Sequence, residues 1–346
     1  MTSTQTTLPA TRAGSDFAEL SRTIKNSGLL DRRRGYYVQK IATNAVLMGA
    51  GWTVFALLGS SWWQLLTAVF FAGLFTQLAF IGHDAGHKQI FRGRRANDVV
   101  GYLHAGLIGM SYGWWVGKHS RHHANPNHED EDPDIEIPLL AFSEEQAAGK
   151  RGVLRWMTKY QAFLFFPLLA FEGLNLHFCG VQAVLRREVR ATRLEAALLA
   201  AHILGYFAAV FWVLSPLQAV AFIAVHQGLW GVYMGCSFAP NHKGMPILSA
   251  AEKLDFLRKQ VLTSRNVRGG RVVDFVLGGL NYQIEHHLFP SMPRANLKFA
   301  QPLVREFCLA RDIAYRECGA LNSYVQVLRH LHAIGSPLRS RVPALS

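Results

Sequence analysis

Long uncharged apolar stretches come in pairs along this chain. Residues 42–61 and 62–82 contain no Asp, Glu, Lys or Arg, and each is close to the ~20 residues that a helix needs to cross a bilayer. The Gly-Ser-Ser run at 59–61 predicts a turn between them. We therefore expect a transmembrane hairpin with spans at about 42–61 and 62–82. The alternative is a buried hairpin in a large soluble protein, but two adjacent uncharged runs of this length are rare in soluble folds.

A second pair follows in the middle of the chain. Residues 196–240 contain no Asp, Glu, Lys or Arg, and Ser215 and Pro216 lie near the centre of this stretch. Its length allows two crossings, and the Ser-Pro dipeptide predicts the turn between them. We expect spans at about residues 196–214 and 217–238.

The segments outside the hairpins divide the rest of the chain. A polar N-terminal segment covers residues 1–38, and a C-terminal tail covers residues 321–346. Between them, a cap has two parts, at residues 83–193 and 243–320. Two uncharged stretches challenge this division. Residues 99–117 are rich in glycine, and residues 160–171 are too short to span a bilayer. We expect both to be interfacial or buried, within a membrane domain at residues 39–320.

The basic residues predict how the chain is oriented. All 36 lysines and arginines lie in the segments around the hairpins, and the turns expected near residues 60 and 216 carry none. By the positive-inside rule, these segments and both termini face the cytoplasm. The sequence therefore predicts an all-α integral membrane protein with four transmembrane helices in two hairpins and a cytoplasmic helical cap.

The net positive charge indicates which kinds of partner the protein could bind. A formal charge of +13 suggests nucleic-acid binding, but no recognition motif accompanies it. A basic chain with long apolar runs instead favours the lipid bilayer, with its anionic headgroups, and acidic partners. The four cysteines are scattered and predict no disulfide framework.

Three histidine clusters fall in the predicted cytoplasmic cap. They are His83 with His87, His119 with His122 and His123, and His286 with His287. The i, i+4 spacing in the first two clusters places two imidazoles on one face of a helix, where they can bind one metal ion. Adjacent histidines diverge by about 100° on a helix and can serve different ions. So many nitrogen ligands suit two metals, and imidazole binds zinc, copper, iron or nickel.

Polar residues in or beside the clusters can orient the ligand rings. A histidine that binds a metal usually donates its other N–H to a carboxylate or carbonyl group. Asp84 and Glu285 lie inside the clusters, and Asn125 follows the second cluster. We expect these three to hold ligand histidines in place; the alternative is ordinary capping or surface roles.

The three clusters together resemble the membrane fatty acid desaturase family. The order His-x-x-x-His, His-x-x-His-His and Gln-x-x-His-His, interleaved with two apolar hairpins, matches that family over about residues 40–315. The Gln-Ile-Glu-His-His form of the third box is similar to front-end acyl desaturases and related bacterial enzymes. The resemblance implies two non-haem irons and an extra ligand after the fourth span, where His242 stands. The implied ligand set is then His83, His87, His119, His122, His123, His242, His286 and His287.

Two departures from the family pattern change the expected iron ligands and the expected electron donor. Many relatives have histidine where Gln283 stands, so one iron is expected to have a weaker ligand or water there. Many front-end relatives also carry a fused cytochrome domain marked by His-Pro-Gly-Gly, which this sequence lacks. We therefore expect electrons from a separate donor: a ferredoxin, a rubredoxin or a cytochrome with its reductase.

The resemblance implies that a cis double bond is inserted into a fatty acyl chain, as acyl-CoA or acyl-lipid, with O2 as co-substrate. Tyr112, Trp114 and Trp115 then line an acyl tunnel, or they are interfacial anchors. Lys118 and Arg121 meet a CoA phosphate or lipid headgroup, or belong to a generic basic surface.

Other functions remain open at this point. A lipid hydroxylase or ketolase uses the same boxes. A membrane haem electron carrier would need axial histidines within spans, such as His202 and His226. The acidic residues 129–136 form a solvated loop, or they support the second cluster or dock a partner.

Overall fold

The four long apolar stretches form four long helices. A computed structural model describes residues 15–249 and 251–339. Within these residues, four helices are long and apolar enough to cross a membrane: α2 (Arg34–Leu58), α3 (Gln64–Gly86), α10 (Thr192–Val213) and α11 (Pro216–His242). The number and order agree with the expected spans. Helix α2 begins at Arg34 rather than near residue 42, because the polar residues before the apolar stretch continue the same helix.

The two expected turns lie next to each other. Gly59 ends α2 with a φ of 56°, a conformation that glycine adopts without strain. At the other turn, Ser215 and Gln218 form a capping box that starts α11. The Ser60 hydroxyl donates to Gln218 Oε1 at 2.6 Å, so the turns contact each other directly.

The long helices expose apolar side chains on their outer surfaces. Leu57, Leu204 and Trp212 are 83%, 70% and 91% exposed, respectively. Inside, α11 packs against α3, and α2 packs against α3. An apolar outer surface around a packed interior is what a bilayer-embedded helical protein requires.

The two ambiguous stretches are broken helices. Within residues 99–117, α4 (Arg94–Leu107) ends before a turn at Gly109, which has a φ of 71°, and α5 (Tyr112–Ala124) follows. No continuous helix therefore crosses there. Helices α8 (Gln161–Leu169) and α9 (Glu172–Leu185) meet at an angle of 69°, and together they are apolar enough to count as a fifth, broken span.

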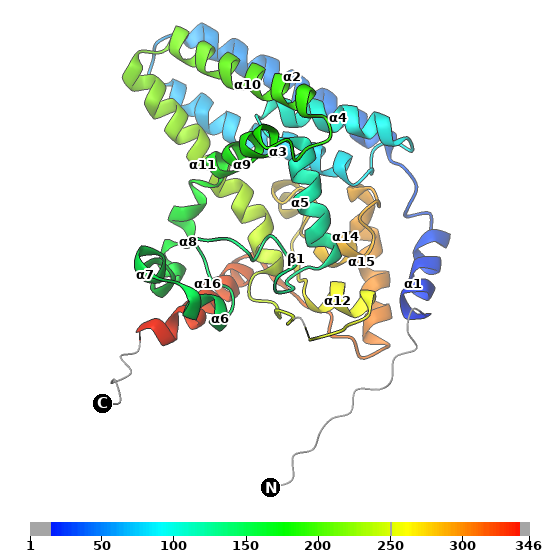
Figure 1. Ribbon diagram of the computed structural model, residues 1–346. Coiled ribbons are helices and arrows are strands. Elements are labelled where there is room, and N and C mark those ends of the chain that lie inside the picture. The colour runs from blue at the N-terminus through cyan, green and yellow to red at the C-terminus, as the bar shows by residue number, and fades with distance from the viewer. Residues whose placement is uncertain (1–14, 250, 340–346) are drawn as a thin grey trace, which may run out of the picture.

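The smaller elements gather at one end of the long helices (Figure 1). They are α1 (Ser15–Asn26), α6 (Glu144–Gly149), α7 (Gly152–Lys159), α12 (Phe256–Leu262), α13 (Arg271–Val276), α14 (Gln283–Leu288), α15 (Arg294–Leu309) and α16 (Ala320–Arg339). Two three-residue strands, β1 (Asn266–Arg268) and β2 (Glu317–Gly319), pair in parallel. Most of the expected C-terminal tail is α16, which packs on α7 and α8. The first 14 residues of the expected N-terminal segment lie outside the described part.

Candidate metal centre

The first two histidine boxes occupy the last turns of two helices. His83 lies in the final turn of α3, and His87 caps its end. In α5, Ser111 caps the start by accepting a hydrogen bond from Trp114 N, and the second box occupies the end. Because i, i+4 positions share a helix face, each helix end presents a pair of imidazoles to the same space.

The third box and His242 approach from other elements. His286 and His287 lie on the short buried helix α14. His242 is the last residue of α11, and its carbonyl accepts from Asn127 Nδ2 at 2.9 Å. The buried Arg265 donates to the carbonyls of Pro240 and Lys243 and so holds the end of α11 in place.

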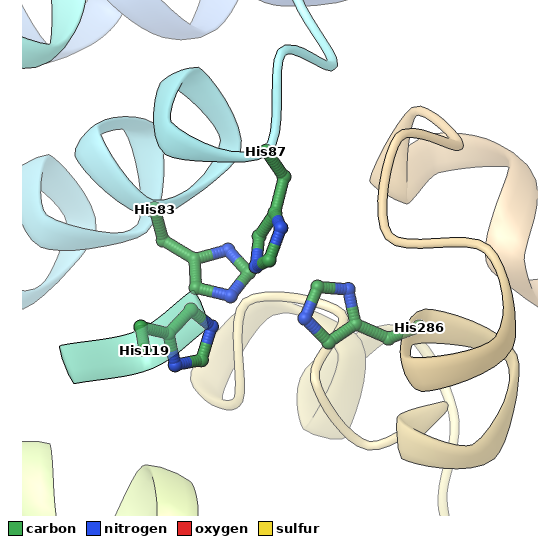
Figure 2. A group of neighbouring side chains, drawn as sticks. All are labelled: His83, His87, His119 and His286. Atoms are coloured by element: carbon green, nitrogen blue, oxygen red, sulfur yellow. The ribbon is translucent and has the colours of Figure 1, made fainter. Parts of the chain in front are cut away.

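The structure brings the eight expected histidines together as two neighbouring groups with His123 between them. In the first, one ring nitrogen from each of four histidines lies within 4.8 Å of the others: His83, His87, His119 and His286. Figure 2 shows these four rings turned toward a common centre. In the second group the same limit joins His122, His242 and His287. His123 lies between the groups, with its ring centroid 4.5 Å from that of His87 and 4.1 Å from that of His287.

The ring nitrogens fit metal ions. Among the described residues, His83 Nε2, His87 Nε2 and His287 Nε2 are buried and have no hydrogen-bond partner, and neither nitrogen of His286 has one. Leaving such groups unpaired in the interior is costly. Burial, followed by the neighbouring histidines, lowers the pKa values of His286 and His287 well below the ordinary range. Neutral imidazoles with free lone pairs are the form that binds metals.

The outer ring nitrogens are held by hydrogen bonds. His122 Nδ1 lies 3.0 Å from each carboxylate oxygen of Asp132. His287 Nδ1 lies 2.9 Å from Gln260 Oε1, and His242 Nδ1 lies 3.1 Å from the Thr263 carbonyl. These bonds fix Nδ1 as the donor and turn Nε2 toward the centre of the second group, the arrangement usual for metal-bound histidine.

Asp132 and Asp134 lie close enough to His122 that the three side chains could together bind a metal ion. His122 uses Nδ1 for these carboxylates and keeps Nε2 for the second histidine group, so we assign the aspartates to orienting the ring. Burial alone would raise the pKa of Asp132, but its interactions with the His122 ring and with the Lys243 ammonium group lower it instead. The acidic loop thus contributes a buried, ionised anchor.

Of the three polar residues expected to orient the histidines, Asp84 contacts a histidine ring, whereas Asn125 and Glu285 bond to other side chains. Asp84 contacts His83 Nδ1 at 3.2 Å and forms a buried ion pair with Arg294 at 2.6 Å. Asn125 Oδ1 instead accepts from Lys259 Nζ at 2.7 Å. Glu285 accepts from Asn266 Nδ2 and from the Tyr315 hydroxyl, both at 2.7 Å, and these bonds fix α14 to β1 and to the segment before β2.

Sequence reasoning missed several of the residues that hold the site. Gln260, Thr263 and Arg294 carry no local signal, because each lies far along the chain from the ring it supports. Asp132 lay in the acidic segment 129–136, for which support of the second cluster was one of the open interpretations.

Gln283 lies at the edge of the second group. Its Nε2 is 2.9 Å from His242 Nε2, and its Oε1 accepts from Asn241 Nδ2 at 3.2 Å. The side chain is buried, so its amide faces the same interior space as the histidines.

An apolar cavity starts at His83 and runs between α3, α4, α5 and α11. It is lined by Ala79, Gly82, His83, Ala105, Ile108, Met110, Ser111, Tyr112, Trp115, Met234 and Phe238. Trp115 also stacks on His119, with ring centroids 4.6 Å apart. Tyr112 and Trp115 therefore line the cavity, whereas Trp114 lies outside the lining and packs between the main core and a smaller apolar cluster that includes Val184 and Val189.

The remaining candidates have other surroundings. Lys118 forms an ion pair with Asp134, and Arg121 is exposed. Tyr206 contacts both candidate axial histidines: its ring stacks on His202, and its hydroxyl lies 2.8 Å from His226 Nδ1. Aromatic side chains thus occupy the space that a haem between these histidines would need.

Comparison with known proteins agrees with this geometry. The family model described as fatty acid desaturase matches residues 60–319. The acyl-lipid (9-3)-desaturase of Physcomitrium patens is 31% identical over 92% of this chain, which spans 62% of that relative. The Delta(6)-fatty-acid desaturase fat-3 of Caenorhabditis elegans is 29% identical, with 94% of this chain and 76% of the relative covered. The Delta(8)-fatty-acid desaturase of Euglena gracilis is 29% identical, with 96% and 81% covered. The chain belongs to the fatty acid desaturase family.

Proposed function

We propose that this protein is a membrane-bound, two-iron fatty acyl desaturase that takes its electrons from a separate carrier. The observation that carries the proposal is the convergence of eight histidines, six of them buried, into two adjoining groups joined by His123, beside an apolar cavity. Oxygen activation by iron would supply the oxidising power. The overall change converts –CH2–CH2– to –CH=CH–, and O2 with two electrons and two protons becomes two molecules of water.

The two histidine groups are the proposed iron ligands. The first would use His83, His87, His119 and His286, and the second would use His122, His242 and His287, with His123 between them. All are nitrogen donors, which suit iron as well as other transition metals. Family membership favours iron among these.

The chain's own part is to place the substrate and exclude water. The cavity includes His83 and is lined mainly by apolar and aromatic side chains, so an acyl chain that enters it would be desolvated and held next to the metal ligands. Tyr112 and Trp115 form part of its wall. Their rigid rings limit where a methylene can lie relative to the ligands, and this position sets which carbon reacts.

We further propose that the metal centre and both termini face the cytoplasm. The boxes lie at the ends of α3 and α11, away from the turns at Gly59 and Ser215. The basic residues gather around the box end of these helices, as the positive-inside rule requires of a cytoplasmic face.

The test combines metal analysis with product analysis. Detergent-purified wild type, His286→Ala and the control His332→Ala, which changes an exposed histidine outside the boxes, are assayed for iron. Fatty acid methyl esters from the same expressing cells are then profiled. About two irons per chain and a new unsaturated ester, both reduced in His286→Ala only, support the proposal. A hydroxylated or ketone product would assign the sister chemistry, and zinc or haem in place of iron would refute the proposal.

A further inference from the structure

A cluster of arginines, which we call the arginine patch, adjoins the segments that follow the first and third histidine boxes. We define it as Arg32, Arg33, Arg34, Arg92, Arg94 and Arg95. The first three precede or begin α2, and the others lie between the first histidine box and the first turn of α4. The Tyr37 hydroxyl, just after the first three arginines, donates to Gln89 Oε1 at 2.9 Å, just before the others, so the two segments lie side by side.

The patch has a large excess of positive charge. Asp31 and Asp98 are the carboxylates within residues 31–34 and 88–98. Asp98 is already shared between Lys88, at 2.5 Å, and Arg94, at 3.6 Å. Arg92, Arg94 and Arg95 are exposed. Such a concentration of like charge attracts an anionic partner over a distance of about one Debye length.

The patch is joined to the metal centre by packed, bonded groups. Arg32 Nη1 donates to the carbonyl of Ser291 at 2.6 Å, in the loop that directly follows the third histidine box. Gln89, two residues after His87, donates to the Pro290 carbonyl in the same loop at 2.9 Å. Arg294, at the end of that loop, reaches His83 through its ion pair with Asp84.

A second surface near the histidine boxes has an excess of negative charge. A surface pocket beside Asn125, close to the second histidine box, is lined by Glu129, Asp130, Glu131 and Glu252 together with Lys253 and Lys259. An acidic macromolecule would be repelled there and attracted to the arginine patch. The charges therefore favour binding of an acidic macromolecule at the arginine patch over binding at the acidic pocket.

We propose that the arginine patch is the docking surface for a small acidic electron-carrier protein. This inference rests on the proposed function, because only an enzyme that consumes two electrons from a separate carrier needs such a surface. An anionic lipid surface is the competing occupant. The bonded connection from the patch to the segments that carry the first and third histidine boxes favours the carrier, since a lipid headgroup has no need of contact with the metal centre.

The test uses a triple variant and a matched control. R92Q/R94Q/R95Q removes three exposed charges from the patch. K150Q/R151Q/R155Q removes three charges around α7, which lies on the other side of the cap from α15 (Figure 1). Both variants are supplied with an acidic [2Fe–2S] ferredoxin kept reduced by NADPH and its reductase. Turnover is measured between about 0.02 and 0.3 M salt, a range over which surface charges become screened.

We expect kcat/KM for the ferredoxin to fall about tenfold in the patch variant at low salt, with kcat at saturating ferredoxin unchanged. The difference from wild type should shrink as salt is added. The control should stay within about twofold of wild type. Equal values for the two triple variants at every salt concentration would overturn the proposal.

Two further measurements separate the possible failures. Single turnover after reduction by dithionite needs no carrier, so wild type must form the double bond in this assay or the proposed function itself fails. The patch variant must match wild type there; a deficit would place the arginines in folding or substrate binding and overturn the docking proposal. A deficit that appears only in vesicles containing anionic lipid would assign the patch to the membrane surface instead.

Discussion

Asp132 offers the sharpest test of how the metal centre is held. Its side chain is fully buried, and both oxygens lie 3.0 Å from His122 Nδ1. It also accepts from the backbone N–H groups of Asn127, at 2.7 Å, and Asp134, at 2.9 Å. Asp132→Asn keeps the size of the side chain and removes its charge, so His122 loses an ionised acceptor; the amide nitrogen also gives up one of the two bonds from backbone N–H groups, so folding of the variant is checked first.

The size of the effect follows from this one bond. A hydrogen bond to a charged group contributes about 1.5–3 kcal/mol. The amide retains part of it, so we expect a loss of about 1.4–2.8 kcal/mol, which corresponds to about 10–100-fold weaker metal binding. Loss of residues that orient metal ligands generally falls in this range. The loss should affect the group of His122, His242 and His287, leaving the other group intact.

The assay is anaerobic titration of purified apoprotein with ferrous iron in competition with a chelator of known affinity. Wild type is expected to bind two irons, and Asp132→Asn should bind one with unchanged affinity and one more weakly. Asp130→Asn is the control, because Asp130 is exposed on the same loop and asparagine tolerates its φ of 63°. Superimposable titrations of wild type and folded Asp132→Asn would refute the anchoring role.

Three other outcomes can be checked directly. Arg294→Met leaves the buried Asp84 carboxylate without its cationic partner, which costs about 3–5 kcal/mol. The apparent Tm in detergent should fall, and Asp84→Leu in the same chain should restore part of it. Gly101→Val should destabilise the protein by about 1–3 kcal/mol through overpacking, because even a Cβ there would lie 2.2 Å from the Tyr112 ring; thermal unfolding and product profiles should both change. Chelation of iron from the purified enzyme should abolish turnover, and ferrous iron should restore it, as followed by product formation.

The spans and the histidine boxes could be predicted because their signals are local. A long uncharged stretch can satisfy its backbone in a bilayer only as a helix, so composition alone predicts α3 and α11. Spacing of i, i+4 fixes which imidazoles share a helix face wherever the helix lies. The turn at Gly109 was harder to locate, because glycines within residues 99–117 mark several possible breaks.

The supporting residues could not be predicted in the same way. Glu285 is adjacent to His286, but neighbouring residues on a helix diverge by about 100°, and this rotation turns Glu285 toward Asn266 and Tyr315. Gln260 lies well before the third box in sequence, yet it contacts His287 because α12 packs on α14. Closeness in sequence is therefore a poor guide to which residues orient the ligand rings.

The departure at Gln283 makes the two histidine groups unequal. On α14, Gln283 lies four residues before His287, so both share one face, and that face meets His242. In the second box, the corresponding position is His119, which belongs to the group of four. The group of three is therefore the one in which an amide stands where another imidazole could stand. With an amide at this position, a metal ion bound by His122, His242 and His287 would keep a position open for another molecule.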